Sequence, residues 1–221
     1  MSQIFSNLFL MLILSGNLIS FMVFLAPVTI FYGIYKRKST EGFHSVRYVI
    51  AHFSCMLWVY YAYIKTDEIL HITNNAFGLL VESVYIVIYL IYAPLRAKKL
   101  TAAIVIFLNV TIFGVIVAIT LLLFHGQKRL NILGWICVGF SVIFFAAPLS
   151  IMRLVIRTKN VEFMPFNLSI LETISAAVWL GYGLMSKDIY VALTNIVGLL
   201  FGIAKMVLDL LYLQRCQAGK Q

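Results

Sequence analysis

The sequence predicts an all-α membrane protein with seven transmembrane helices, arranged as two parallel three-helix bundles joined by an inverting linker helix (3+1+3). Three observations predict this fold: a very apolar composition, basic residues gathered in alternate loops, and an internal repeat. Hydrophobic residues make up 62% of the chain and charged residues 11%, and the mean hydropathy is +0.99. A soluble domain has roughly 45–50% apolar and about 25% charged residues, so most of this surface requires a lipid solvent.

Apolar runs between charged segments predict the seven helices. The first 35 residues contain no Asp, Glu, Lys or Arg, which is too long a run for a signal-peptide core. Pro94 closes the third helix, because proline lacks the amide hydrogen that the next turn would use. The predicted helices cover residues 7–33, 45–64, 69–93, 101–124, 130–156, 165–186 and 189–213.

The basic residues predict the orientation of the chain. Twelve of the 17 lysines and arginines fall in alternate loops and the tail, four fall in the remaining loops, and Lys205 lies inside a span. The positive-inside rule then predicts an outside N-terminus and a cytoplasmic C-terminus, which requires an odd number of helices. We expect a multi-pass protein of the plasma membrane. The net charge of +9 needs no nucleic acid to explain it.

An internal repeat organises the chain. A shift of 121 residues superposes Pro27 on Pro148 and Trp58 on Trp179, and a shift of 120 superposes Asn75 on Asn195. A unit of three helices ends on the opposite side of the membrane from where it begins. Two such units therefore have the same orientation only if one extra helix lies between them. We therefore predict a first repeat over residues 1–100, a linker helix over 101–126, and a second repeat with a short tail over 127–221.

The repeat carries a duplicated set of polar and aromatic residues. In each unit a serine stands four residues before a tryptophan, on one helical face, and an asparagine follows on the next helix. Indole faces can cover the C–H faces of a sugar while amides and hydroxyls exchange hydrogen bonds with its hydroxyl groups. The alternative is that tryptophan marks the membrane interface and asparagine joins helices. The set is Ser54, Trp58, Asn75, Ser175, Trp179 and Asn195.

Other residues within the spans have two interpretations each. Pro27 and Pro148 are hinges or static kinks. Intramembrane charges are costly, and the sequence favours structural pairing over proton coupling for them. The pairing partners are Lys205 with Asp209, four residues apart, or Lys205 with Glu172. Glu82 is the fourth ionisable residue within a span.

No pattern for catalysis is visible in the sequence. It contains no nucleophile elbow and no phosphate loop, and Cys55, Cys137 and Cys216 lack the spacing of metal ligands. We expect no enzymatic activity, no cofactor and no metal site.

Several segments, in order over essentially the whole chain, resemble the SWEET sugar transporters of plants, which belong to the PQ-loop superfamily. The resemblance implies the architecture of that family, a pair of parallel repeats with sites near the bilayer midplane. The similarity around residues 137–166 is greatest to the subgroup that carries sucrose as well as glucose. The matching segments are Phe24–Pro27, Lys38–Phe43, Met56–Trp58 with Tyr60 and Tyr61, Asn75–Gly78, Cys137–Ser141, Ala146–Arg153 and Val161–Phe166.

The resemblance also implies bidirectional, facilitated movement of sucrose, glucose or both by alternating access. It adds Ser20, Val23, Ser141 and Phe144 to the duplicated set as lining of the pocket. It further implies an outer gate at Tyr61 and Asp188 and an inner gate made of prolines. The inner gate would include Pro27, Pro148, Pro165 and position 47.

Three departures from the family pattern change these expectations. Arg47 replaces the fourth gating proline, so an altered or less mobile inner gate is expected. Phe144 stands where sucrose carriers more often have a smaller side chain, which would narrow the pocket and favour a monosaccharide. Glu172 and Lys205 are charged where uncharged residues are expected. The chain also stops soon after its last helix, which indicates a truncated or engineered form.

Two other functions remain as alternatives, and homo-oligomerisation is left open. A proton-coupled carrier of the PQ-loop group would show uptake driven by a pH gradient. A seven-helix retinal protein or receptor could use Lys205 as the Schiff base and Glu82 as the counterion, although the internal repeat argues against it. Sugar and the lipid bilayer are the expected partners.

Overall fold

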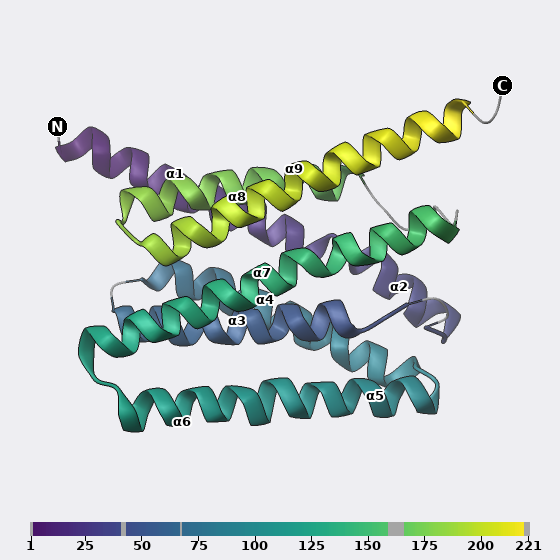
Figure 1. The fold of residues 1–221 in the computed structure, drawn as a ribbon, viewed down its shortest axis with the longest axis horizontal. Helices are drawn as coiled ribbons and strands as arrows, with labels where there is room; N and C mark the ends of the chain where they lie inside the picture. Colours follow the sequence, from purple (N-terminus) through teal and green to yellow (C-terminus); the bar gives the residue numbers. More distant parts are fainter. Residues whose placement is uncertain (1, 41–42, 67, 159–165, 219–221) are drawn as a thin grey trace. The chain divides into compact units, whose positions relative to one another are not determined.

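The computed structural model describes residues 2–40, 43–66, 68–158 and 166–218, and within them the chain is helical with no strand (Figure 1). Most successive helices are joined by short connections. Their bounds are α1 Ser2–Leu25, α2 Val28–Arg37, α3 Val46–Lys65, α4 Ile69–Tyr92, α5 Leu95–Val105, η1 Ile106–Ile112, α6 Phe113–Leu123, α7 Gly126–Thr158, α8 Phe166–Met185 and α9 Ile189–Ala218.

Counted as spans, these elements give the seven predicted helices. α1 and α2 form one span that is interrupted at Pro27, whose ring removes a backbone donor and bends the helix. α5, η1 and α6 run on without a break, and η1 is a π-helical stretch in the middle of that span. The predicted all-α class with seven helices is confirmed.

Six segments within the described residues are long and apolar enough to span a bilayer. α3, the second predicted span, is not among them, because it carries four tyrosines, His52 and cations near both ends. Nine of its 20 residues are buried. A helix that its neighbours cover can hold more polar groups than one that faces lipid.

The predicted start of the linker helix at residue 101 is wrong. α5 begins at Leu95, directly after Pro94 as its N-cap. Arg96, Lys98 and Lys99 are therefore helical and do not lie in a loop. Proline suits the start of a helix because its missing donor would be unpaired there in any case, so the chain turns directly from one helix into the next.

The helices form two compact units. Unit 1 contains residues Met1–Val23 and Ser141–Gln221, and unit 2 contains Phe24–Phe140. Both boundaries fall inside a helix, in α1 before Pro27 and in α7 before Pro148. The first helix of each sequence repeat is thus divided between the two units.

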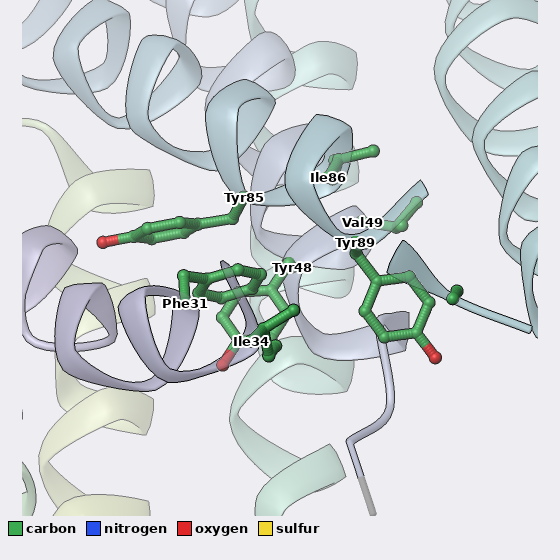
Figure 2. Packing of buried hydrophobic residues seen from close by; sticks show 8 residues of the cluster. Phe31, Ile34, Tyr48, Val49, Tyr85, Ile86 and Tyr89 are labelled. Carbon is green, nitrogen blue, oxygen red and sulfur yellow. The ribbon is translucent and has the colours of Figure 1, made fainter. Parts of the chain in front are cut away.

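Unit 2 has an aromatic core, shown in Figure 2. Phe31 stacks on Tyr85 with ring centroids 4.3 Å apart, and Tyr48 packs edge-on against both rings. The Tyr85 hydroxyl donates to the Phe24 carbonyl at 2.9 Å. Such aromatic pairs each contribute about 0.5–1.5 kcal/mol beyond area burial. These three ring contacts hold α2, α3 and α4 together on the C-terminal side of Pro27.

Close helix approaches repeat in the two units. A Cβ at Gly78 would lie 2.5 Å from the Phe24 ring and 2.9 Å from the Cys55 sulfur. A Cβ at Gly198 would lie 2.9 Å from the Phe145 ring and 3.4 Å from the Ala176 Cβ. Phe145 and Ala176 stand 121 residues after Phe24 and Cys55, so the packing of both units supports the internal repeat.

The tightest backbone approach joins α8 to α9 and gives a stability prediction. A Cβ at Gly183 would lie 2.6 Å from the Ala192 nitrogen, whereas a Cβ at Gly114 would meet nothing within 4 Å. Gly183→Ala should therefore destabilise the protein by about 1–3 kcal/mol through overpacking. Gly114→Ala should be neutral or slightly stabilising, because alanine favours helices.

Thermal unfolding of the purified protein in detergent measures both effects. A lower apparent Tm is expected for Gly183→Ala alone. Equal Tm values for the two variants would show that α8 and α9 do not approach as closely as the structure has them.

Candidate functional site

Unit 2 holds the first set of the duplicated residues, which includes the buried indole of Trp58. Trp58 in α3 packs edge-on against Tyr61, with ring centroids 5.5 Å apart and planes at 79°, and against His71 in α4 at 5.3 Å. Ser54 lies one turn before Trp58 on the same helix and is half-buried. Ser54, Trp58 and Asn75 are referred to below as the first half-site.

Unit 1 repeats this geometry. Trp179 in α8 packs edge-on against Tyr182, with ring centroids 5.4 Å apart and planes at 82°. Both rings are buried. The tryptophan–tyrosine pair therefore has nearly the same form in both units. Ser175, Trp179 and Asn195 are referred to below as the second half-site.

The two asparagines are held in the same way. Asn75 Nδ2 donates to the His71 carbonyl at 2.9 Å, and Asn195 Nδ2 donates to the Val191 carbonyl at 2.8 Å. Each bond spans four residues within one helix and uses one of the two amide hydrogens. The second hydrogen and the oxygen of each amide are not used by this bond. Each half-site thus holds an amide in a fixed orientation.

Ser20 joins the second half-site from α1. The Trp179 indole nitrogen donates to Ser20 Oγ at 2.8 Å, and Ser20 Oγ lies 3.1 Å from Ser175 Oγ. Ser20 is 5% exposed. Three residues predicted for the pocket are thus joined by hydrogen bonds. In sequence Ser20 corresponds to Ser141 by the 121-residue shift, and Ser141 is also buried.

The remaining pocket candidates also belong to unit 1. Val23 and Phe144 are half-buried, and Phe144 packs edge-on against Phe145 at 5.4 Å. The local packing of each half-site is described within its own unit. Their union into one pocket stays a prediction from the repeat.

The predicted gate residues have identifiable local roles in the described part of the chain. Asp188 is buried, and its Oδ1 accepts the backbone N–H groups of Tyr190 and Val191 at 2.9 and 3.1 Å, which caps α9. Pro27 is buried at the kink between α1 and α2.

The other gate candidates are less fully described. Arg47 lies in the first turn of α3 and is half-buried. Pro148 lies within α7, but its side chain lies outside the described part, and Pro165 lies outside the described residues altogether. Their roles as gates stay predictions.

A salt bridge resolves one of the alternatives for the intramembrane charges. Lys205 Nζ in α9 lies 2.9 Å from Glu172 Oε2 in α8. The pairing of Lys205 with Glu172 is confirmed. The side chain of Asp209 is not described, so its pairing with Lys205 stays untested. Glu82 in α4 is 5% exposed, and its Oε2 has no hydrogen-bond partner among the described residues.

Two polar contacts of unit 2 were not predicted from the sequence. His52 Nε2 lies 3.0 Å from Ser83 Oγ, and the Tyr60 hydroxyl bonds both Thr120 at 2.8 Å and Arg129 at 2.6 Å. The sequence did carry a signal for these contacts. His52 and Tyr60 lie within a predicted span, and a buried histidine or tyrosine needs a polar partner. These bonds fasten α3 to its neighbours α4, α6 and α7.

The salt bridge between α8 and α9 gives a second stability prediction. Glu172→Leu leaves the largely buried Lys205 ammonium without its partner, which should cost at least about 1–3 kcal/mol. The double variant Glu172→Leu with Lys205→Leu should recover most of that loss, because an apolar pair can replace a buried ion pair.

A double-mutant cycle of thermal unfolding in detergent tests this. If the loss of stability in the double variant equalled the sum of the losses in the two single variants, the two charges would not interact.

Comparisons with known proteins agree with this geometry. The model of a family described as "Sugar efflux transporter for intercellular exchange" matches residues 10–97 and 131–217, once for each repeat. The bidirectional sugar transporter SWEET13 of Oryza sativa subsp. japonica is 57% identical over 200 residues, which is 90% of this chain and 68% of that protein. Bidirectional sugar transporter N3 of Medicago truncatula is 53% identical over 197 residues, which is 89% of this chain and 74% of that protein.

Two further matches give the share of a relative's length that the chain covers and the similarity of its fold to a solved structure. SWEET15 of Oryza sativa subsp. indica is 55% identical over 197 residues, which is 89% of this chain, and the chain spans 62% of the length of that protein. The solved structure of a eukaryotic SWEET transporter superposes with a TM-score of 0.84 at 27% identity, over 96% of this chain and 100% of that one. The multi-pass membrane architecture, the two repeats and these matches together show that the chain belongs to the SWEET family of plant sugar transporters.

Proposed function

We propose that this protein is a bidirectional uniporter that moves sucrose, glucose or both across a membrane by alternating access. The observation that carries the proposal is the pair of matched half-sites, each with a tryptophan packed on a tyrosine and an asparagine anchored to its own helix. The relatives named as bidirectional sugar transporters support it. The chain belongs to a family of transporters, not enzymes, which leaves the retinal alternative without support.

The chemistry of the half-sites fits a neutral polyol. None of the ten predicted pocket residues is ionisable, so a charged ligand would find no counterion among them. Indole faces pack on the C–H faces of a sugar ring, and the unused amide groups of Asn75 and Asn195 can donate to and accept from hydroxyl groups. A symmetric pair of such half-sites suits a disaccharide with two rings or a single ring held from both sides.

Substrate binding requires an exchange of hydrogen bonds at Trp179. Its indole N–H is donated to Ser20 in this structure. A sugar hydroxyl in the pocket can take the place of Ser20 as the acceptor, and Ser20 and Ser175 then become available to the sugar. Because Ser20 lies in α1 and Trp179 in α8, such an exchange would couple sugar binding to the packing of α1.

The proposed gates follow from the resemblance to the family. We assign Tyr61 and Asp188 to the outer gate, and Pro27, Arg47, Pro148 and Pro165 to the inner gate. Pro27 separates α1 from α2 and supplies a point at which the span can bend. Arg47 lacks the fixed φ of a proline. The inner gate of this protein should therefore lack a proline hinge at the start of α3.

Facilitated transport is favoured over proton coupling. Glu172 already has a cationic partner in Lys205, so a proton on Glu172 would break an existing ion pair. A proton-coupled carrier is the second candidate, and the buried Glu82, with a carboxylate oxygen that bonds none of the described residues, favours it. The effect of a pH gradient on uptake separates these two candidates.

We also propose the setting in which this transport occurs. The basic loops favour an outside N-terminus and a cytoplasmic C-terminus in the plasma membrane. The working unit would be the two sequence repeats with the linker helix between them, and a homo-oligomer is compatible with this arrangement. The similarity to SWEET13 and SWEET15 supports sucrose beside glucose as a substrate.

Uptake of labelled glucose and sucrose into proteoliposomes tests the paired site. Asn75→Ala and Asn195→Ala should each lower uptake roughly tenfold or more, because each removes a hydrogen-bonding group from the sugar. Asn131→Ala is the matched control, since Asn131 is exposed and accepts a hydrogen bond from Gln127 of its own helix.

Uptake should be the same with and without an inward proton gradient. A loss confined to one of the two asparagine variants would contradict the paired site. Acceleration by the gradient would instead identify a proton-coupled carrier.

Phe144 gives a prediction of selectivity. Phe144→Val removes an aromatic ring from the predicted pocket and should raise the ratio of sucrose to glucose uptake by roughly tenfold. The ratio is measured in the same proteoliposomes with both labelled sugars. Phe107→Val is the control, because Phe107 is 58% exposed and lies in η1, outside the predicted pocket. A ratio that is unchanged in Phe144→Val would mean that this ring does not limit the size of the substrate.

A further inference from the structure

The end of α2 and the start of α5 lie at the same end of unit 2 (Figure 1), and six basic residues stand at these two places in the sequence. We call this set the basic end. Most of its members are exposed and Lys98 is half-buried. The basic end consists of Lys36, Arg37, Lys38, Arg96, Lys98 and Lys99.

Contacts around Tyr92 bring the two halves of the basic end together. Lys38 Nζ donates to the Tyr92 hydroxyl at 2.9 Å and lies 3.9 Å from the centroid of the Tyr35 ring. Tyr35 packs edge-on against Tyr92 at 6.0 Å. Tyr92 is the last residue of α4, and α5 starts three residues later. The end of α2 is therefore fixed to the end of α4, three residues before α5 begins.

The charge of the basic end is not balanced within the two helices that carry it. Neither α2 nor α5 contains an acidic residue. The hydrogen bond from Lys38 to Tyr92 raises the pKa of that lysine, so Lys38 stays charged at neutral pH. Cations also oppose the positive end of a helix dipole, which makes Arg96, Lys98 and Lys99 unfavourable for the start of α5. An external anion would relieve this repulsion.

We propose that the basic end binds the phosphate-bearing headgroup of an anionic phospholipid. Tyr35, 54% exposed, and Tyr92 are aromatic residues of the kind found at the headgroup level of a bilayer. Clusters of four to eight Lys or Arg residues beside a transmembrane helix attract anionic lipids. The guanidinium groups of Arg37 and Arg96 can each bind a phosphate through two hydrogen bonds.

A lipid explains the placement better than a free anion does. The basic end lies on elements that continue directly into apolar spans, since α2 belongs to the span Ile13–Arg37 and α5 to the span Leu95–Leu123. A ligand with both a phosphate and acyl chains can contact the cations and the adjoining apolar surface together. The exposed Leu95 and Leu100 of α5 supply such surface beside Arg96.

The test uses the full chain in detergent and short-chain lipids as probes. Affinities for dioctanoyl phosphatidylserine, dioctanoyl phosphatidylcholine and inorganic phosphate are measured by thermophoresis at low salt. The variant is Arg96→Gln with Lys98→Gln. The charge-matched control is Lys128→Gln with Lys187→Gln, which removes two cations located elsewhere in the chain. Size-exclusion elution and Tm establish that each protein is folded.

The expected result is preferential binding of phosphatidylserine, weakened roughly tenfold or more in the Arg96 and Lys98 variant and unchanged in the control. Lys98→Gln alone should give an intermediate loss, so the inference does not depend on one variant. Equal binding of phosphatidylcholine, equal loss in the control, or displacement of the lipid by an equal concentration of inorganic phosphate would overturn it.

Discussion

Hydrocarbon offers no hydrogen bonds, and this property of the solvent governs the whole structure. Backbone groups in a bilayer must be paired within the chain, which leaves helices as the solution for this sequence. The same demand falls on side chains, so every polar residue inside a span needs a neighbour that can satisfy it. Trp179 forms a hydrogen bond with Ser20, and Lys205 forms a salt bridge with Glu172. The Tyr60 hydroxyl forms hydrogen bonds with Thr120 and Arg129. The amides of Asn75 and Asn195 keep hydrogen-bonding capacity beyond their helix bonds and coincide with the duplicated residues of the repeat. Among the described residues, the buried amides of Asn17, Asn74 and Asn109 also have atoms without a hydrogen-bond partner.

Much of the fold could be predicted because the relevant signals are local or repeated. The length of the apolar runs indicated the spans, and the recurrence of Trp58 at Trp179 indicated the two repeats. The start of α5 could not be read in the same way, because hydropathy does not distinguish a loop from the polar first turn of a helix, where Arg96 lies. The partner of Trp179 also escaped prediction. Ser20 is 159 residues away, and only the packing of α1 against α8 brings these side chains within bonding distance.

The two half-sites are alike without being identical. The tryptophan–tyrosine pairs have the same geometry, and both asparagines bond the carbonyl one turn before them. His71 in unit 2, whose ring packs on Trp58, has an aliphatic counterpart in Val191 of unit 1. The aromatic surface beside the tryptophan therefore differs between the two half-sites.

The division of the helices between the units also constrains how the protein is made. Unit 2 is a continuous stretch, Phe24–Phe140, whereas unit 1 combines Met1–Val23 with Ser141–Gln221. The ribosome therefore completes unit 2 while α1, with the buried polar residues Asn17 and Ser20, still lacks α8 and α9. Ser20 gains its bonds to Ser175 and Trp179 only when the second repeat is inserted. During synthesis the buried face of α1 therefore lies in the membrane before the α8 side chains that bond Ser20 have been made.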